Sequence, residues 1–166
     1  MSAAPFRVLA LESGHDRTTF DSGSAALDHY FQQQVSQDIR RRVTACFVAL
    51  TPEARLAGFY TLASASLSLA DLSPSLRKKL PRYPTVPAVR MGRLAVDRTY
   101  RGRGLGGALL ADALARTLRA EIAAYALVVD AKDETAAAFY RHHGFSQLSD
   151  SELTLFLPLA TARGAE

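Results

Sequence analysis

The stretch RTYRGRGLGGALL, Arg98 to Leu110, decides how this sequence is interpreted. It places four glycines and three arginines within thirteen residues and then turns apolar. Glycine permits backbone conformations closed to other residues and lets a ligand approach the main chain, while arginine attracts anions. A helix that begins at such a loop directs its positive end toward the same place. The stretch therefore predicts a phosphate-binding site.

The glycines can be aligned with two phosphate-binding patterns. One is G-x-G-x-x-G, the dinucleotide fingerprint, in which Asp130 at the end of the following strand would bind a ribose. That match is weak, because DRTYR separates the preceding strand from the first glycine and the chain after Asp130 is too short for further βα units. The other pattern is R-x-x-G-x-G, in which successive backbone N–H groups converge on a diphosphate. It is formed by Arg101, Gly104 and Gly106.

Composition and charge narrow the class of protein. A chain of 166 residues with 48% hydrophobic and 22% charged residues is expected to form one globular domain. No stretch approaches the roughly 18 uninterrupted apolar residues of a membrane span, and the N-terminal residues lack a signal-peptide pattern. We therefore expect a cytoplasmic protein with no membrane association. The net charge of +4 and pI near 9.5 favour an anionic partner, either a phosphate ester or a nucleic acid.

Cysteine and histidine usage gives no sign of a metal or a disulfide. Cys46, the single cysteine, lies in the apolar run TACFVAL, so we interpret it as a buried structural thiol. The spacing of the four histidines does not match a metal site. We expect no metal ion.

Hydrophobic periodicity predicts an α/β or α+β domain. Apolar residues recur at every fourth position from Leu27 to Ile39 and along one side of 105–122, which indicates two helices. A third helix is expected over 133–144, with Asp133 as its N-cap and Gly144 as its stop. The segment 72–87 holds four prolines and is expected to be irregular with one short helical turn. Strands are expected over 6–12, 44–50, 56–70, 88–96, 125–131 and 153–159.

A second motif gives the glycine loop a family context. The glycine loop is part of the longer stretch LAVDRTYRGRGLG, Leu94 to Gly106, and FYRHHGF, Phe139 to Phe145, follows later in the chain. With these two motifs the sequence resembles the GNAT acetyltransferases, whose pyrophosphate loop and F-Y-x-x-x-G-F helix have the same patterns. The resemblance implies a single GNAT domain over 1–166, with a mixed central sheet flanked by helices. It also implies acetyl-CoA as cosubstrate, bound between splayed central strands.

The resemblance assigns roles to particular residues. The backbone of Leu94, Ala95 and Val96 would pair with the pantetheine arm. Tyr140 would be the general acid, because a phenol with an ordinary pKa near 10 stays protonated at neutral pH and can give its proton to a departing thiolate. Phe139 beside it is expected to be a core aromatic. The pyrophosphate would be held by Arg101, Gly102, Arg103, Gly104, Leu105, Gly106 and Gly107.

Over most of its length the chain is similar to the GNAT toxins of bacterial toxin–antitoxin pairs, the TacT-like proteins. The similarity extends from about Asp21 to Leu159 and includes FDSGSAALDHYF and GFYTLASASLSLADLS. It implies acetylation of the α-amino group on aminoacyl-tRNA, which stops translation. It also implies neutralisation by a ribbon-helix-helix antitoxin. Homodimers are common in that family, although no stretch of this sequence is recognisable as an interface.

The predicted strand 88–96 bears on the acceptor. It carries no carboxylate to act as a general base, whereas an α-amino group titrates near 8 and an aminoacyl ester lower still, so such an acceptor could arrive neutral. We expect RNA to contact the basic residues Arg77, Lys78, Lys79, Arg90 and Arg93. Two alternatives stay open: a GNAT enzyme for a small amine or a protein N-terminus, and a dinucleotide-binding module without catalysis.

Overall fold

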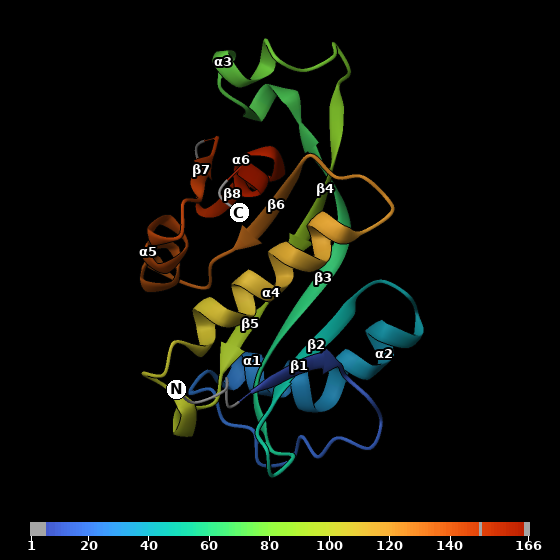
Figure 1. The fold of residues 1–166 in the computed structure, drawn as a ribbon, viewed down its shortest axis with the longest axis vertical. Helices are drawn as coiled ribbons and strands as arrows, with labels where there is room; N and C mark the ends of the chain where they lie inside the picture. The colour runs from blue at the N-terminus through green and yellow to red at the C-terminus, as the bar shows by residue number, and fades with distance from the viewer. Residues whose placement is uncertain (1–5, 150, 165–166) are drawn as a thin grey trace. The chain divides into compact units, whose positions relative to one another are not determined.

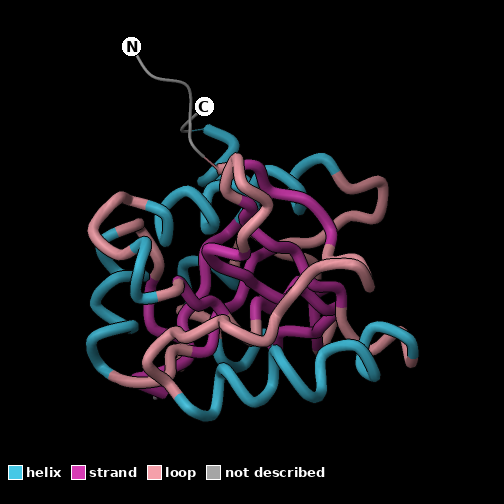
Figure 2. The backbone as a smooth tube through the Cα atoms, turned by 90° about the horizontal axis from the view of Figure 1, so that it is seen from below, coloured by secondary structure: helices cyan, strands magenta, loops and turns pink. Residues whose placement is uncertain are grey.

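The computed structural model describes residues 6–149 and 151–164. Its tertiary contacts divide the chain into two compact units, Met1–Ala63 with Gly92–Ala113, and Ser64–Met91 with Leu114–Glu166. We describe each unit by itself. Figure 1 labels the elements, and Figure 2 colours them by type. The expected single domain over 1–166 stays a prediction.

The first unit is an antiparallel sheet with helices from two parts of the chain. Its strands pair in the order β1-β2-β3-β5. They are β1 (Arg7–Ala10), β2 (Ala45–Leu50), β3 (Leu56–Ser68) and β5 (Leu94–Val96). Its helical segments are α1 (Ala25–His29), the π-helix η1 (Tyr30–Gln34), α2 (Val35–Arg40), the 3₁₀ helix η3 (Arg98–Tyr100) and the start of α4 (Leu105–Arg119).

The apolar stripe predicted between Leu27 and Ile39 packs against this sheet. Phe31 and Val35 are fully buried, while Leu27 and Ile39 are partly buried against the same cluster. The Phe31 ring stacks on that of Phe59 from β3, with 4.2 Å between centroids. Burying a side chain of this size contributes about 1.5–3 kcal/mol. The predicted helix is thus confirmed, with a π turn in its middle.

The second unit contains a mixed sheet. β4 (Thr85–Met91) pairs in parallel with β6 (Ala126–Asp130), and β6 and β7 (Ser146–Leu148) each pair antiparallel with β8 (Ser151–Pro158). Its core includes Leu67, Val86, Val128 and Phe156. The helical segments are η2 (Leu69–Asp71), α3 (Pro74–Arg77), α5 (Glu134–His142) and α6 (Leu159–Gly164). Parallel and antiparallel pairs in one sheet confirm the mixed sheet that the GNAT resemblance implies.

Two expected elements differ from the structure by more than two residues. The strand predicted over 88–96 is two strands, because β4 pairs with β6 whereas β5 pairs with β3, and the change of partner falls at Gly92 and Arg93. The helix predicted over 105–122 ends at Arg119, and Ile122 is 86% exposed. The chain must leave the helix there, because the Tyr125 N–H is already bonded to the Pro87 carbonyl beside β6.

The first unit generates a stability prediction at Gly58. A Cβ at this position of β3 would lie 2.9 Å from Leu109 Cδ1 and 3.0 Å from the Ala95 carbonyl oxygen, so backbone would have to shift. We expect Gly58→Ala to lower the free energy of unfolding by about 1–3 kcal/mol, measured by urea denaturation. Gly14→Ala is the control, because a Cβ there meets no atom within 4 Å. Equal effects of the two substitutions would contradict this packing constraint.

Candidate functional site

The glycine loop lies between η3 and α4, and Arg101 to Gly104 are exposed. Gly102 has φ +78° and Gly104 has φ +76°, both in the left-handed region. A Cβ at either position would meet no atom within 4 Å, so the need for glycine is conformational. Left-handed residues within a loop turn successive N–H groups toward one concave side, which is a favourable arrangement for an anion.

The helix that follows adds its positive end to this loop. The first helical hydrogen bond runs from Ala108 N to the Gly104 carbonyl, and Leu105 is buried, which anchors the first turn. α4 has 15 residues with no acidic residue in its first turn, while Arg116 and Arg119 lie in its last turn. No carboxylate of the first turn therefore offsets the positive potential there. Gly106 and Gly107 belong to the first turn of α4.

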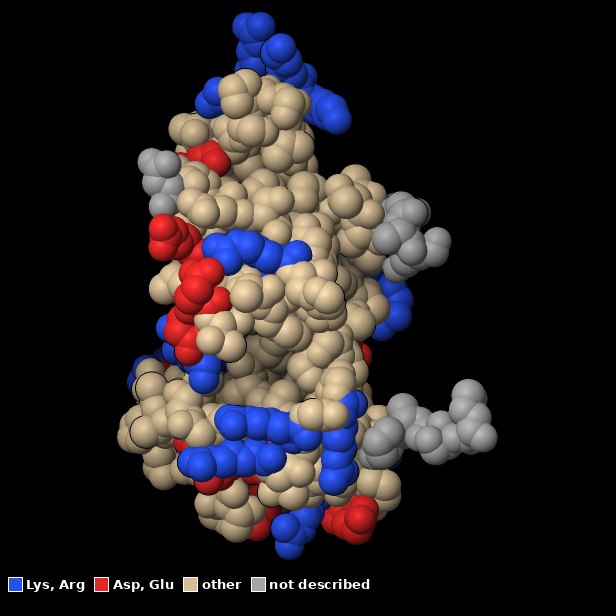
Figure 3. Space-filling view, turned by 90° about the vertical axis from the view of Figure 1, so that its left-hand side faces the viewer, with Lys and Arg blue, Asp and Glu red and all other residues tan. Residues whose placement is uncertain are grey.

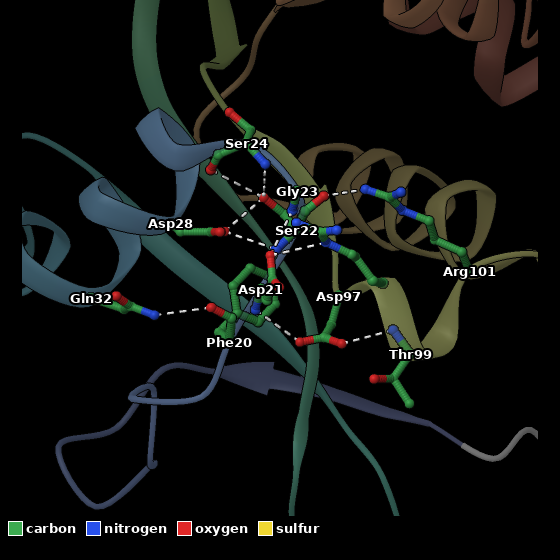
Figure 4. Close-up of polar contacts among 11 residues, drawn as sticks. Phe20, Asp21, Ser22, Gly23, Ser24, Asp28, Gln32, Asp97, Thr99 and Arg101 are labelled. Atoms are coloured by element: carbon green, nitrogen blue, oxygen red, sulfur yellow. Dashed lines mark hydrogen bonds and ion pairs between the residues drawn. The ribbon is translucent and has the colours of Figure 1, made fainter.

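The arginines in and beside the loop have partners within the first unit. Arg101 donates a hydrogen bond from its guanidinium to the Ser22 carbonyl, as Figure 4 shows. Arg98 pairs through Nε with the Asp21 carboxylate at 3.2 Å. The Arg103 guanidinium lies 5.5 Å from the centroid of the Tyr100 ring. The positive charge is thus held beside the glycines by short-range contacts.

A buried carboxylate connects this loop to the N-terminal turn. Asp97 is 7% exposed and is the N-cap of η3. Its carboxylate accepts hydrogen bonds from Thr99 N and from Asp21 N, both at 2.9 Å (Figure 4). The Asp97 N–H donates to the Ala57 carbonyl of β3 at 2.8 Å. Asp97 therefore fixes strand, loop and turn in one arrangement.

The N-terminal turn that is bonded to Asp97 and Arg101 is the stretch DSGS, residues 21–24. Asp28 accepts hydrogen bonds from Ser22 N at 2.9 Å and from Ser22 Oγ at 2.6 Å. Gly23 has φ +90°, and a Cβ there would lie 2.8 Å from Arg101 Nη2. From the sequence, this stretch is recognisable only as a turn. Its Asp, Ser and Gly residues are the signal, but nothing in the sequence pairs them with residues 97–101.

The residues expected to contact the pantetheine arm form β5. Leu94, Ala95 and Val96 pair with Tyr60, Phe59 and Gly58 of β3. Because β5 ends the strand order of the first unit, it has an edge in that unit, and strand edges carry the backbone groups that an amide-containing ligand can bond. The pantetheine contact of these residues stays a prediction.

Arg93, just before β5, is held on an aromatic ring. Its guanidinium carbon lies 3.5 Å from the centroid of the Tyr30 ring, which is the range of a cation–π contact. The Tyr30 hydroxyl donates to the Asp38 carboxylate at 2.8 Å. Burial, together with this hydrogen bond, raises the pKa of Tyr30 above its ordinary value. The π turn η1 begins at this tyrosine.

Tyr140 lies on α5 in the second unit. The helix begins as predicted, with Asp133 accepting from Ala136 N at 2.9 Å, and Gly144 has φ +94° just past its end. Tyr140 is 3% exposed, and its hydroxyl lies 3.9 Å from Met91 Sδ. Burial, with a smaller contribution from the charge of Asp130, raises the pKa of this phenol above its ordinary value. It stays protonated throughout the neutral range. Phe139, expected in the core, is only half-buried.

Arg90, expected to contact RNA, has a partner in the second unit. Its Nη1 lies 2.6 Å and 2.8 Å from the two carboxylate oxygens of Asp130, and both side chains are about two-fifths exposed, 38% and 41%. Asp130 is the residue that a dinucleotide site would use for ribose, and here it binds a guanidinium.

Three of the expected RNA-binding residues lie together at α3. Arg77, Lys78 and Lys79 are all exposed, and Figure 3 shows basic side chains gathered at the tip that carries this helix. The structure adds Arg82 and Tyr83, also exposed, the latter at 64%. An exposed aromatic within a basic loop is typical of single-strand binding surfaces. The basic run RKKLPR, Arg77 to Arg82, is evident in the sequence, and what sequence reasoning missed is the exposed aromatic that follows it, Tyr83.

The remaining expectations concern the cysteine, metal ions and the membrane. Cys46 is 3% exposed, and burial raises the pKa of its thiol to about 12. Among the described residues, no three His, Cys, Asp or Glu side chains come close enough to hold a metal ion. Within the same residues, no helix has the length and apolar character needed to cross a membrane.

Comparisons with known proteins place the chain in one family. The model of the Acetyltransferase (GNAT) domain matches residues 43–147. A protein of Mycobacterium tuberculosis (strain ATCC 25618 / H37Rv) named "tRNA-acetylating toxin" is 37% identical over 97% of this chain and 95% of its own length. A protein of Sinorhizobium fredii named "Probable toxin TacT" is 30% identical over 90% of this chain and 88% of its own.

Solved structures of similar fold include complexes. AtaT complexed with acetyl-methionyl-tRNAfMet matches with a TM-score of 0.86 and 30% identity, over 96% of this chain and 98% of that one. AtaTR bound with AcCoA matches with a TM-score of 0.80 and 30% identity, over 97% and 98%. An AtaT mutant bound to the C-terminus of the antitoxin AtaR matches with a TM-score of 0.79 and 25% identity, over 98% of both chains.

Asp97 generates the prediction for this site. Asp97→Asn replaces one acceptor oxygen by an NH₂ group facing a backbone N–H, so we expect it to lower the free energy of unfolding by about 1–3 kcal/mol. Urea denaturation measures the change. Asp16→Asn is the matched control, because Asp16 also accepts two hydrogen bonds, from Thr18, but lies exposed to water. A similar decrease in both variants would show that the burial of Asp97 has no special effect.

Proposed function

The chain belongs to the GNAT acetyltransferase family, and we propose that it transfers the acetyl group of acetyl-CoA to the α-amino group of an aminoacyl-tRNA, acting as a toxin that stops translation. The observation that carries the proposal is the similarity over nearly the whole chain to a tRNA-acetylating toxin, at 37% identity. The match to AtaT complexed with acetyl-methionyl-tRNAfMet supports the same acceptor.

The first unit has the features that acetyl-CoA requires. A loop with two left-handed glycines, the unopposed positive end of α4 and the side chains of Arg101 and Arg103 suit a pyrophosphate. The edge of β5 suits the amides of the pantetheine arm. When bound, acetyl-CoA supplies a thioester carbonyl and a thiol leaving group. We assign the pyrophosphate to residues 101–107 and the pantetheine arm to Leu94, Ala95 and Val96.

Tyr140 is the proposed general acid. Its buried phenol is protonated at every physiological pH, so its Oη proton is available for a departing sulfur. Neither β4 nor β5 contains an Asp or Glu that could take a proton from the amine. An acceptor that arrives neutral does not need one, and the α-amino group of an aminoacyl ester meets that condition better than a lysine side chain.

RNA is proposed to contact the exposed basic loop at α3 in the second unit and Arg93 in the first. Arg77, Lys78 and Lys79 can neutralise backbone phosphates, and Tyr83 offers a ring for base stacking. Arg93, whose guanidinium carbon lies 3.5 Å from the centroid of the Tyr30 ring, offers a planar cation of the kind that bases stack on.

The toxin role requires a neutralising partner. An antitoxin complex of AtaT is among the similar structures. We propose a ribbon-helix-helix protein as the antitoxin of this chain and a homodimer as its assembly.

The test of the proposed function is transfer of radiolabelled acetyl from acetyl-CoA to charged tRNA, uncharged tRNA and a panel of free amines. We expect label on charged tRNA alone, and a decrease of about 10²–10⁴-fold in kcat with Tyr140→Phe, which removes the acidic proton and keeps the ring. Because the pKa of Tyr140 is raised, kcat should not fall as pH rises from 7 to 9. If free amines are labelled and charged tRNA is not, the proposed acceptor is wrong, whereas the acetyltransferase activity stands.

The basic loop is tested by Lys78→Ala combined with Lys79→Ala. We expect weaker binding of charged tRNA, and a plot of log Kd against log salt whose slope falls by about 0.7 for each single-strand phosphate that the protein no longer neutralises. Arg119→Ala, which removes an exposed charge at the far end of α4, is the control. An unchanged salt slope in the double variant would exclude this loop from the RNA surface.

A further inference from the structure

Arg93 differs from the other arginines near β4, β5 and the glycine loop in how its charge is held. Arg90 and Arg98 are each paired with an aspartate, and Arg101 donates to a backbone carbonyl. In the part of the chain that the structure describes, the Arg93 guanidinium has no ion pair and no hydrogen bond. No buried polar side-chain atom of that part lacks a hydrogen-bond partner, so the Arg93 nitrogens reach solvent. Their N–H donors are therefore available to a ligand.

The ring of Tyr30 holds this guanidinium in place. The guanidinium carbon lies 3.5 Å from the ring centroid, well within the roughly 6 Å limit of a cation–π contact. The Arg93 carbonyl accepts from Thr61 N of β3 at 3.1 Å, which fixes the backbone just before β5. With both ends held, the side chain loses the rotamer freedom that a free arginine has. Because the partner is a ring and not a carboxylate, the cation is ordered without being neutralised.

Tyr30 is itself fixed by its surroundings. It is 5% exposed within the core cluster of the first unit, and its hydroxyl donates to the Asp38 carboxylate of α2 at 2.8 Å. The π turn η1 begins at Tyr30, and Arg17 donates to the Phe31 carbonyl of that turn at 2.7 Å. π turns within helices are frequent at functional sites. Here the turn and the Asp38 carboxylate together set the position of the ring that contacts Arg93.

We propose that Tyr30 is a positioning residue for the RNA acceptor, which holds the Arg93 guanidinium ready to bind the single-stranded end of charged tRNA. The proposal rests on the proposed function, since it assumes an RNA acceptor. Unpaired bases of RNA stack on guanidinium planes. An arginine that is ordered before the ligand arrives gives up less conformational entropy on binding, which strengthens the complex. A mobile Arg93 would bind the same RNA more weakly.

The experiment measures Kd for charged tRNA with Tyr30→Leu, which removes the ring, and with Tyr30→Phe, which keeps it. We expect Tyr30→Leu to raise Kd roughly 3–10-fold, within the range of one cation–π contact, and Tyr30→Phe to stay within about twofold of wild type. The slope of log Kd against log salt should be the same in both, because both retain the charge of Arg93. Kd for acetyl-CoA should also be unchanged.

A double-mutant cycle shows whether Tyr30 acts through Arg93. In an Arg93→Ala background, Tyr30→Leu should have no further effect on Kd for charged tRNA, because the group that it positions is gone. Thermal unfolding of each variant separates a folding defect from a change in affinity, and Tyr30→Met replaces Tyr30→Leu if the leucine variant does not fold. An equal rise of Kd in both backgrounds overturns the positioning role, and so does an unchanged Kd with Tyr30→Leu alone.

The matched control is Phe20→Leu. Phe20 belongs to the same core cluster, is 4% exposed against 5% for Tyr30, and packs its ring on those of Phe31 and Phe59. This substitution removes core packing but keeps the ring that contacts Arg93, so Kd for charged tRNA should stay within about twofold of wild type. A rise like that of Tyr30→Leu would assign the effect to lost packing and overturn the proposal. Failure of the wild-type protein to label charged tRNA would overturn the proposed function itself, a result distinct from these.

Discussion

The buried carboxylate of Asp97 is the interaction on which the first unit depends. It follows β5 directly, caps η3 through Thr99 N and accepts from Asp21 N across a large separation in sequence. A carboxylate removed from water is tolerable only when hydrogen bonds of this kind compensate for the missing hydration. Because the bonds come from two separate segments, the carboxylate holds the start of the glycine loop against the turn at residues 21–24. The conformation of the loop is therefore determined by long-range contacts as well as by its own glycines.

The sequence was most informative where local chemistry decides the outcome. The helix stripe from Leu27 to Ile39 and the cap at Asp133 follow from periodicity and side-chain hydrogen bonding, and both are observed. The left-handed conformations of Gly102 and Gly104 agree with the reason for which the loop was singled out. Patterns of this kind are visible in a few neighbouring residues, and tertiary contacts do not override them here.

Other features depend on partners that are distant in the chain. The strand predicted over 88–96 divides because its two halves pair with β6 and β3, and no local pattern distinguishes a strand that changes partner from one that continues. Two side-chain contacts also join residues that are far apart in the chain. They are the contact of Arg101 with the Ser22 carbonyl and that of Arg90 with Asp130. In the sequence, the R-x-x-G-x-G pattern made Arg101 a candidate for phosphate, and charge made Arg90 one. The structure adds that both arginines also have acceptors within their own unit, whereas the basic residues at α3 are exposed.

The burial of Cys46 has a consequence for redox chemistry. Coenzyme A ends in a thiol, and its disulfide exchanges with any protein thiolate that it can reach. Cys46 is the single cysteine of the chain, it is 3% exposed, and burial raises the pKa of its thiol to about 12. Almost no thiolate is present at neutral pH, and little of the sulfur is accessible. Cys46 is therefore a poor partner for exchange with the disulfide of coenzyme A.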